Sequence, residues 1–525
     1  MLLPAGRRRG GARRRVLAAV AGSAVLALGL SGCTAFAGAL SGLGFDVPPQ
    51  LPEEPAGTVE GFGAQEPIWL PCGSGMQCSD IWAPLDWGDP GGEKITLRLI
   101  KHEASDAEPL GTLFLNPGGP GASGVEYLSG GVEFAVQEDV LQKYDVIGWD
   151  PRGVGRSTPV ECLDAKGMDD YLFGDDETAD LEQGSPAWVS AAEAETREFG
   201  EACLERTGDL LGHVDTLSTV RDLDMLRAIV GDEKLNYLGY SYGTKIGAMY
   251  AGEFPERVGR LVLDGAMDPT STQGDVVWYQ TQGFELALRA YVTDCLEGDD
   301  CPFTGSVDEA MGEISEQLTQ IENHPLRGSD GRPLTVGTML TAIITPLYSE
   351  SRWDYLDQLF TSVAEGNADV ALALADLYYD RENGRYLTNS TEAFSAINCL
   401  DYPAPELDME QARASADELA KIAPTIGRYQ GYGEIGCYGW PIESHSQAAP
   451  ITAAGADPIL VLGTTGDPAT PYSWAVSLAD QLESGVLVTR VGEGHTAYGE
   501  NDCINDVVDD YLLTGAVPAS DPRCE

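Results

Sequence analysis

Short apolar runs alternate with helix-like stretches through the first half of the chain. Residues 217–230 have the apolar spacing of a helix, whereas residues 95–100 alternate apolar and polar as an edge strand does. Four further runs are apolar, rich in strand-forming residues and end at loops: 112–116, 144–149, 235–238 and 260–264. Apolar strands separated by helices predict an α/β fold with a mostly parallel sheet covered by helices on both faces.

The alternation stops near Thr270. The next stretch has mainly helical periodicity, at 279–294, 307–323, 355–365, 368–379 and 409–422. Strand-like runs return at 458–462 and 487–491. We therefore predict a core in two parts, 68–269 and 451–525, interrupted by a helical cap at 270–450. Because open α/β sheets bind ligands beyond the carboxyl ends of their strands, a cap inserted there would cover the site.

The first 32 residues have a composition of their own. Six arginines precede an apolar run from Val16 to Leu30, and Leu30-Ser31-Gly32-Cys33 resembles a bacterial lipoprotein box. We predict a lipoprotein signal peptide at 1–32, lipidation of Cys33 and a flexible Gly- and Pro-rich tether at 33–67. The protein would then sit on the outer face of the cell membrane, or be released to the medium. An ordinary signal peptide or a single membrane anchor are the alternatives, and Arg13-Arg14 also permits twin-arginine export.

The net charge of −51 argues against nucleic acid as a partner, because its phosphates would be repelled. Ten cysteines besides Cys33 form an even set, which indicates disulfides in an exported protein. Pairing of neighbours along the chain is the simplest scheme, although connectivity does not follow from sequence. No C-x-x-C or H-E-x-x-H is present among eleven cysteines and five histidines, so we expect no metal. We expect no organic cofactor either.

Ser241 occupies the centre of Gly239-Tyr240-Ser241-Tyr242-Gly243. The segment follows the apolar run 235–238 and opens the helical stretch 244–254. A strand, a sharp turn with serine at its apex and a helix together predict a nucleophile elbow, in which the glycines permit close packing and the hydroxyl is exposed. A serine hydroxyl is a poor nucleophile until a base takes its proton, so Ser241 needs partners.

Asp467 and His495 are the predicted partners. Asp467 follows the strand-like run 458–462, and His495 follows the run 487–491. The order serine, aspartate, histidine is that of α/β-hydrolases. The histidine would act as the base and the carboxylate would hold its tautomer. Asp264 and Asp268, after the strand-like run 260–264, are rival candidates for the acid.

Asn116-Pro117-Gly118-Gly119-Pro120-Gly121 follows the predicted strand 112–116. An acyl-transfer oxyanion needs two N–H donors. We expect one from the backbone of Tyr242, directly after the nucleophile, and one from this loop at Gly119.

These motifs together resemble the proline iminopeptidase branch of α/β-hydrolases (peptidase family S33). Residues 116–121 resemble its HGGPG loop, with Pro117 where the family often has histidine, and Trp149-Asp-Pro-Arg-Gly-Val-Gly-Arg-Ser157 is similar to its D-x-R-G-x-G-x-S turn. Leu238-Gly-Tyr-Ser-Tyr-Gly-Thr244 and Asp467-Pro-Ala-Thr-Pro471 resemble exported actinobacterial tripeptidyl aminopeptidases. The resemblance implies an α/β-hydrolase fold with an inserted helical cap.

The resemblance also implies a serine aminopeptidase that releases short N-terminal peptides, with peptides as its substrates. Such an enzyme must recognise a free amine, and Asp401 with nearby Asn398 is the predicted amine-binding pair in the cap. A carboxylic-ester hydrolase or lipase on the same fold is the second hypothesis. A catalytically silent surface-binding protein is the third. The sequence leaves the oligomeric state open.

Overall fold

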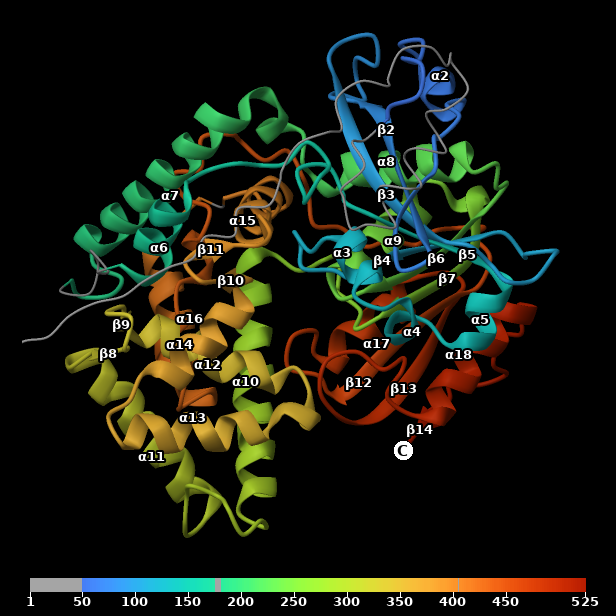
Figure 1. Cartoon of the computed structure of the whole chain (residues 1–525). Coiled ribbons are helices and arrows are strands. Elements are labelled where there is room, and N and C mark those ends of the chain that lie inside the picture. The colour runs from blue at the N-terminus through green and yellow to red at the C-terminus, as the bar shows by residue number, and fades with distance from the viewer. Residues whose placement is uncertain (1–49, 175–180, 405) are drawn as a thin grey trace, which may run out of the picture.

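The computed structural model describes residues 50–174, 181–404 and 406–525. Within them one ten-stranded sheet forms the body of the core, in the order β1-β2-β3-β5-β4-β6-β7-β12-β13-β14 (Figure 1). The strands are β1 (Leu70–Gly73), β2 (Met76–Pro84), β3 (Lys94–His102), β4 (Thr112–Asn116), β5 (Asp145–Trp149), β6 (Leu235–Tyr240), β7 (Val258–Asp264), β12 (Ile459–Gly466), β13 (Gly485–Glu493) and β14 (Arg523–Cys524).

Neighbouring strands from β5 to β14 pair in parallel. The pairs β1–β2, β2–β3 and β3–β5 are antiparallel. Successive side chains point to opposite faces, so Tyr237 and Leu261 join one buried cluster while Leu238 and Val262 join another. Helices cover both faces, as predicted. They include α3 (Gly124–Ser129), α8 (Thr216–Ile229), α9 (Tyr242–Glu253), α17 (Tyr472–Gln481) and α18 (Asp502–Thr514).

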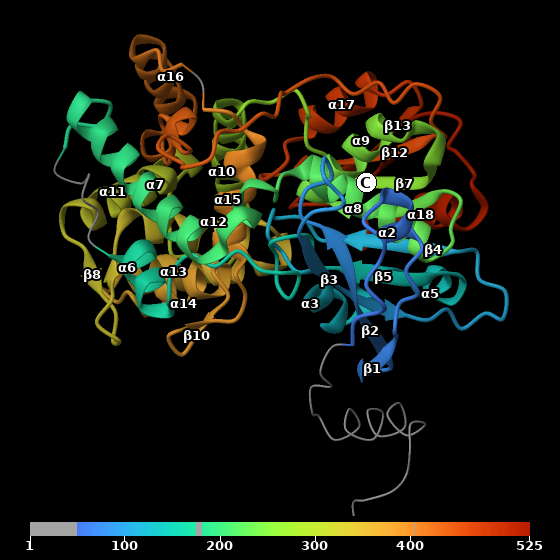
Figure 2. The ribbon, with the colours of Figure 1, turned by 90° about the horizontal axis from the view of Figure 1, so that it is seen from above.

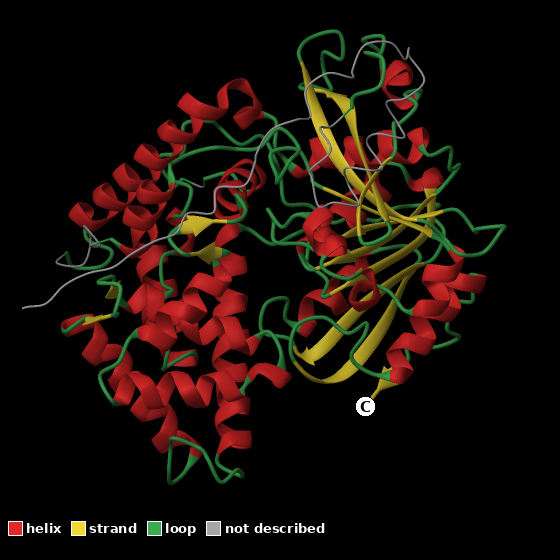
Figure 3. Ribbon diagram, in the orientation of Figure 1, coloured by secondary structure: helices red, strands yellow, loops and turns green. Residues whose placement is uncertain are grey.

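The helical cap lies beside the sheet as a separate body with its own buried cluster (Figures 2 and 3). Its helices are α10 (Gln273–Cys295), α11 (Val307–Asn323), α12 (Val336–Leu347), α13 (Asp354–Ala364), α14 (Asp369–Tyr378), α15 (Ser390–Asp401) and α16 (Met409–Ile422). Capping boxes start α10 and α11, at Thr272 and Ser306, which explains why these two helices begin where they do. The periodicity did not predict α12 and α15.

Two of the predicted domain boundaries differ from the structure. Helices α6 (Ala165–Phe173) and α7 (Pro186–Thr207), predicted as core, lie beside the cap in Figure 1 and contact both parts. Phe173 joins the buried cluster of the cap, whereas Met168 and Phe199 join that of the core. The predicted tether is wrong at its end, because Phe62 of α2 (Val59–Gly63) is fully buried against the core. Apolar contacts between distant segments therefore bring residues before 270 against the cap, and the folded core begins before residue 68.

The predicted signal peptide, Cys33 and the predicted tether up to residue 49 lie outside the described residues. In the described part of the chain no helix is both long and apolar enough to cross a membrane.

Within the described residues, five disulfides join cysteines that follow one another in the sequence, which confirms the simplest pairing. They are Cys72–Cys78, Cys162–Cys203, Cys295–Cys301, Cys399–Cys437 and Cys503–Cys524.

Candidate active site

Ser241 stands at the turn between β6 and α9 with backbone angles of φ 53° and ψ −122°. A positive φ is uncommon for a residue with a side chain and marks a strained turn. The surroundings hold it in place, because the Ser241 N–H donates to the carbonyl of Asp264 at 2.8 Å and its own carbonyl accepts from the N–H and hydroxyl of Thr244. The sharp turn that the sequence predicts is therefore present.

The glycines of this segment are required by packing. A Cβ at Gly239 would lie 2.5 Å from the carbonyl oxygen of Gly243, and one at Gly243 would lie 2.8 Å from that of Asn116. Gly118, at φ 98°, lies against the serine itself: its Cβ would lie 2.8 Å from Cβ of Ser241. The glycine loop that follows β4 therefore packs directly against Ser241.

Asp467 and His495 form a close pair where β12 and β13 end. Nδ1 of His495 lies 2.9 Å from Oδ1 and 3.0 Å from Oδ2 of Asp467. The carboxylate also accepts the N–H groups of Ala469, Thr470 and Thr496 and the hydroxyl of Thr470. Because these donors satisfy a fully buried side chain, its orientation toward the ring is fixed.

The short segment formed by Asp264 and Gly265 contacts both Ser241 and His495. Ser241 contacts the Asp264 backbone, while a Cβ on Gly265 would lie 3.1 Å from Cε1 of His495. The ring bonds to Asp467 through Nδ1, so Nε2 is the nitrogen left for a second partner. The structure has no hydrogen bond between the described side chains of Ser241 and His495, and such bonds are often long until substrate binds.

The rival acids have other partners. Asp264, buried at the end of β7, accepts the N–H groups of Ala497 and Tyr498, so it supports the loop that carries His495 and does not bond to its ring. Burial raises the pKa of Asp264 to about 6. Asp268 accepts from Thr270 and Gln481. Of the three candidates, Asp467 alone contacts the imidazole.

Opposing influences act on His495. Burial lowers its pKa, but the charge and hydrogen bond of Asp467 and the charge of Asp264 outweigh burial, so the pKa is raised from its usual value. The cap contributes one face of this site: the Tyr348 carbonyl accepts the His495 N–H at 2.9 Å, and the Tyr348 ring meets the imidazole edge to face at 5.4 Å. Nothing in the sequence around Tyr348 signals this contact, which arises from docking of the cap.

The loop after β4 carries the second predicted donor. The Gly118 N–H is occupied by Oδ1 of Asn116 at 3.0 Å. The N–H groups of Gly119 and Tyr242 donate to no acceptor within the described residues. Two unused backbone donors thus lie in the loop and the elbow that meet at Ser241.

Asp401, the predicted amine-binding residue, already has partners within the protein. Its carboxylate is buried and already bonded, to Nζ of Lys245 at 2.9 Å and to the N–H and hydroxyl of Thr216. Lys245 belongs to α9 and Thr216 to α8, so Asp401 ties the cap to the core, and it is also among the residues that line a second cavity of about 660 Å³. Asn398 lies one turn earlier in α15, where its carbonyl accepts the Tyr402 N–H.

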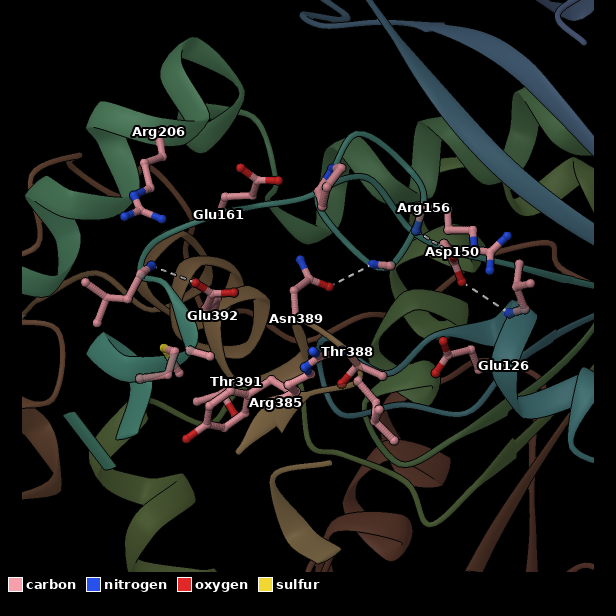
Figure 4. Close-up of a pocket in the computed structure, with 18 residues that line it drawn as sticks. Glu126, Asp150, Arg156, Glu161, Arg206, Arg385, Thr388, Asn389, Thr391 and Glu392 are labelled. Carbon is pink, nitrogen blue, oxygen red and sulfur yellow. Dashed lines mark hydrogen bonds between the residues drawn. The ribbon is translucent and has the colours of Figure 1, made fainter. Parts of the chain in front are cut away.

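A polar cavity of about 660 Å³ lies where the loop after β5 meets the start of α15 (Figure 4). Ser241, Asp467 and His495 do not line it. Two of its carboxylates are committed to backbone N–H groups: Glu392 accepts from Cys162 and Leu163, and Asp150 from Val125 and Arg156. Over the residues that the structure describes, no group of three or more His, Cys, Asp or Glu side chains could hold a metal ion.

Comparison with known proteins gives two family-model matches. The model described as "alpha/beta hydrolase fold" matches residues 111–313, and the model described as "TAP-like protein" matches residues 423–524. The first region includes Ser241 and the second includes Asp467 and His495.

Three similar proteins span most of their own length and most of this chain. The serine protease Hip1 of Mycobacterium tuberculosis is 36% identical over 87% of this chain and 90% of that protein. Carboxylesterase B of the same species is 34% identical over 85% and 86%. The tripeptidyl aminopeptidase of Streptomyces coelicolor is 31% identical over 86% and 83%.

Proposed function

Because this chain belongs to the α/β-hydrolase family and is a serine hydrolase of the peptidase type, we propose that it removes short peptides, such as tripeptides, from free N-termini. The observation that carries the proposal is the Asp467–His495 pair, set at the strand ends beside the strained Ser241. The tripeptidyl aminopeptidase relative supports an exopeptidase that acts on peptides.

The geometry supports a two-step acyl transfer. Nε2 of His495 takes the Ser241 hydroxyl proton as Oγ attacks the scissile carbonyl, and the imidazolium then protonates the leaving amine. Asp467 keeps the Nδ1 proton in place and stabilises the imidazolium. Water next attacks the acyl-enzyme with His495 again as base, which releases the N-terminal peptide and restores Ser241.

The developing oxyanion requires donors that are present before the reaction. The unused N–H groups of Gly119 and Tyr242 are suited to this role, and one such donor contributes about 3 kcal/mol of transition-state stabilisation. They need no movement of a side chain, since both belong to the backbone of tight turns.

A peptidase and an esterase on this fold share the same acyl-enzyme. The relative named carboxylesterase B favours ester hydrolysis as the second candidate function. The test compares a free peptide amide, its N-acetylated form and a carboxylic ester on the same purified protein. We expect cleavage of the free peptide only; equal cleavage of the acetylated peptide excludes an aminopeptidase, and cleavage of the ester alone supports the esterase.

Ser241→Ala tests the nucleophile itself. Since the serine oxygen forms the covalent bond, kcat should fall about 10⁶-fold, with no labelling by a fluorophosphonate probe. Wild-type protein should be labelled at Ser241, as shown by mass spectrometry of the modified peptide. Turnover retained by the variant would exclude the mechanism.

We also propose that the enzyme acts outside the cell, held to the membrane by a lipid on Cys33. The arginine-rich leader and the lipoprotein-like box support this. Metabolic labelling with an alkyne fatty acid should mark the full-length protein and not its Cys33→Ala variant, which should appear in the medium. Labelling of both alike would refute anchoring at Cys33.

A further inference from the structure

A buried chain of polar groups runs from the elbow to the cap. The hydroxyl of Tyr242 lies 2.5 Å from Oγ1 of Thr216, and the same Oγ1 bonds to Oδ2 of Asp401. Oδ2 also accepts from Nζ of Lys245 at 2.9 Å. All four side chains are buried, with exposed fractions of 3% for Tyr242, 0% for Thr216, 5% for Asp401 and 9% for Lys245.

The direction of this chain follows from its chemistry. An ionised carboxylate only accepts, so the single hydroxyl proton of Thr216 is donated to Asp401. Thr216 can then only accept from Tyr242, whose hydroxyl is the donor. The Asp401 carboxylate faces the Lys245 ammonium, and the Thr216 N–H, at the start of α8, also donates to it at 2.9 Å. Every hydrogen bond in the chain therefore depends on one carboxylate.

The cap helix that carries Asp401 also contacts the oxyanion loop. A Cβ on Gly121 would lie 2.5 Å from the Ser390 carbonyl and 3.3 Å from Cβ of Ala393, at the other end of α15. Helix α15 thus touches the Gly119 loop with its first turns and holds the Tyr242 side chain through its last residue.

We infer that Asp401 is a positioning residue, which acts through Thr216 and the Tyr242 hydroxyl to hold the Tyr242 N–H where the oxyanion forms. The inference rests on the proposed function. The side chain and the N–H of Tyr242 are attached to the same Cα, and Tyr242 follows the nucleophile directly, so a shift of the helix start that moves this Cα would move its N–H. Because that N–H binds the oxyanion and not the ground-state substrate, its displacement should lower kcat and leave KM unchanged.

Tyr242→Phe is the primary test, since it removes one hydroxyl and leaves the backbone donor in place. We expect kcat to fall about tenfold, part of the loss from removing a donor altogether, with KM within about twofold. Affinity for a peptide aldehyde, whose adduct with Ser241 carries an oxyanion, should fall by the same factor. Thr216→Val should have a similar effect, and the double variant should lose no more than the larger single one.

Tyr144→Phe is the matched control. Its hydroxyl is equally buried and donates to the Leu512 carbonyl at 2.5 Å, at the opposite end of the strands. This variant should lower the melting temperature and leave kcat and aldehyde affinity as in the wild type. Asp401→Asn is secondary, because it leaves the buried Lys245 charge with the Tyr402 ring and no anionic partner, and it can unfold the protein.

Two outcomes overturn the inference. If Tyr242→Phe and Thr216→Val only lower the melting temperature, as Tyr144→Phe does, the chain is structural and Asp401 positions nothing. If wild-type protein neither cleaves peptides nor is labelled at Ser241, the proposed function fails first and the inference fails with it. Active wild-type enzyme distinguishes the two cases.

Discussion

The core contributes residues to the site at the ends of its strands, whereas the cap contributes single residues at the ends of two helices. Ser241, Asp467 and His495 follow β6, β12 and β13, which are hydrogen-bonded into one sheet. The cap supplies the Tyr348 ring and carbonyl beside His495 and the Asp401 carboxylate behind the elbow.

Under the proposed mechanism, the core supplies the reactive groups and the cap supplies groups that arrange them. A parallel sheet places its carboxyl ends at one edge, so side chains far apart in sequence meet on a rigid frame. Docked helices surround that frame and contact it at points set by packing. We therefore expect core substitutions to remove the chemistry and cap substitutions to weaken it.

Asp467→Asn should have the largest effect of any substitution that leaves Ser241 in place. An amide cannot hold the Nδ1 proton in the required tautomer, so kcat should fall about 10⁴-fold while the fold is kept. Steady-state kinetics and circular dichroism measure both.

Asp264→Asn is its control, since both aspartates are buried at strand ends. Its bonds go to backbone N–H groups, so stability should fall by about 1–3 kcal/mol, with a far smaller loss of kcat than in Asp467→Asn. Equal losses of kcat would mean that Asp264 shares the role of the acid.

Tyr348→Ala should have an intermediate effect and probes the cap. Loss of an edge-to-face contact worth about 0.5–1.5 kcal/mol predicts a fall in kcat of about 2- to 10-fold. Tyr348→Phe keeps the ring and should retain the wild-type rate. A loss as large as that of Asp467→Asn would make the cap part of the chemistry and remove the contrast.

The smallest expected effect is a shift in the pH profile. Since the neutral imidazole is the base, kcat/KM should fall as pH drops through a pKa above the usual histidine value of about 6.5. The charge of Asp264 helps to raise that pKa, so Asp264→Asn should move the acid limb to lower pH by a fraction of a unit. An unmoved or upward-shifted limb would contradict the assigned influence of Asp264 on His495.

The parts of the structure that could be predicted from the sequence are those determined by residues close together in the chain. The apolar runs predicted the central strands, and the residues around Ser241 predicted the sharp turn, because φ at Ser241 and the tight packing at Gly239 are local demands. Asp467 was predicted from its place after a strand and from the order serine, aspartate, histidine, and its Oδ1 lies 2.9 Å from Nδ1 of His495.

The parts that could not be predicted depend on contacts between surfaces that are far apart in the sequence. Asp401 was assigned to a ligand because a carboxylate in the cap suggests an amine, yet folding brings Lys245 and Thr216 against it. Phe62 is a single apolar residue in a segment rich in glycine and proline, and its burial needs the core as a partner. Helix α12 is apolar around most of its surface because it is enclosed by other cap helices, which blurs its period.

Sequence alone was enough to predict the central strands of the sheet, several helices of the cap and the sharp turn at Ser241. These follow from backbone preferences and from the period of apolar positions, which act over a few residues. The pairing of Asp467 with His495, the commitment of Asp401 to Lys245 and the covering of His495 by Tyr348 were settled by folding. Each joins segments far apart in the chain, and a contact of that kind exists only once both surfaces are buried together.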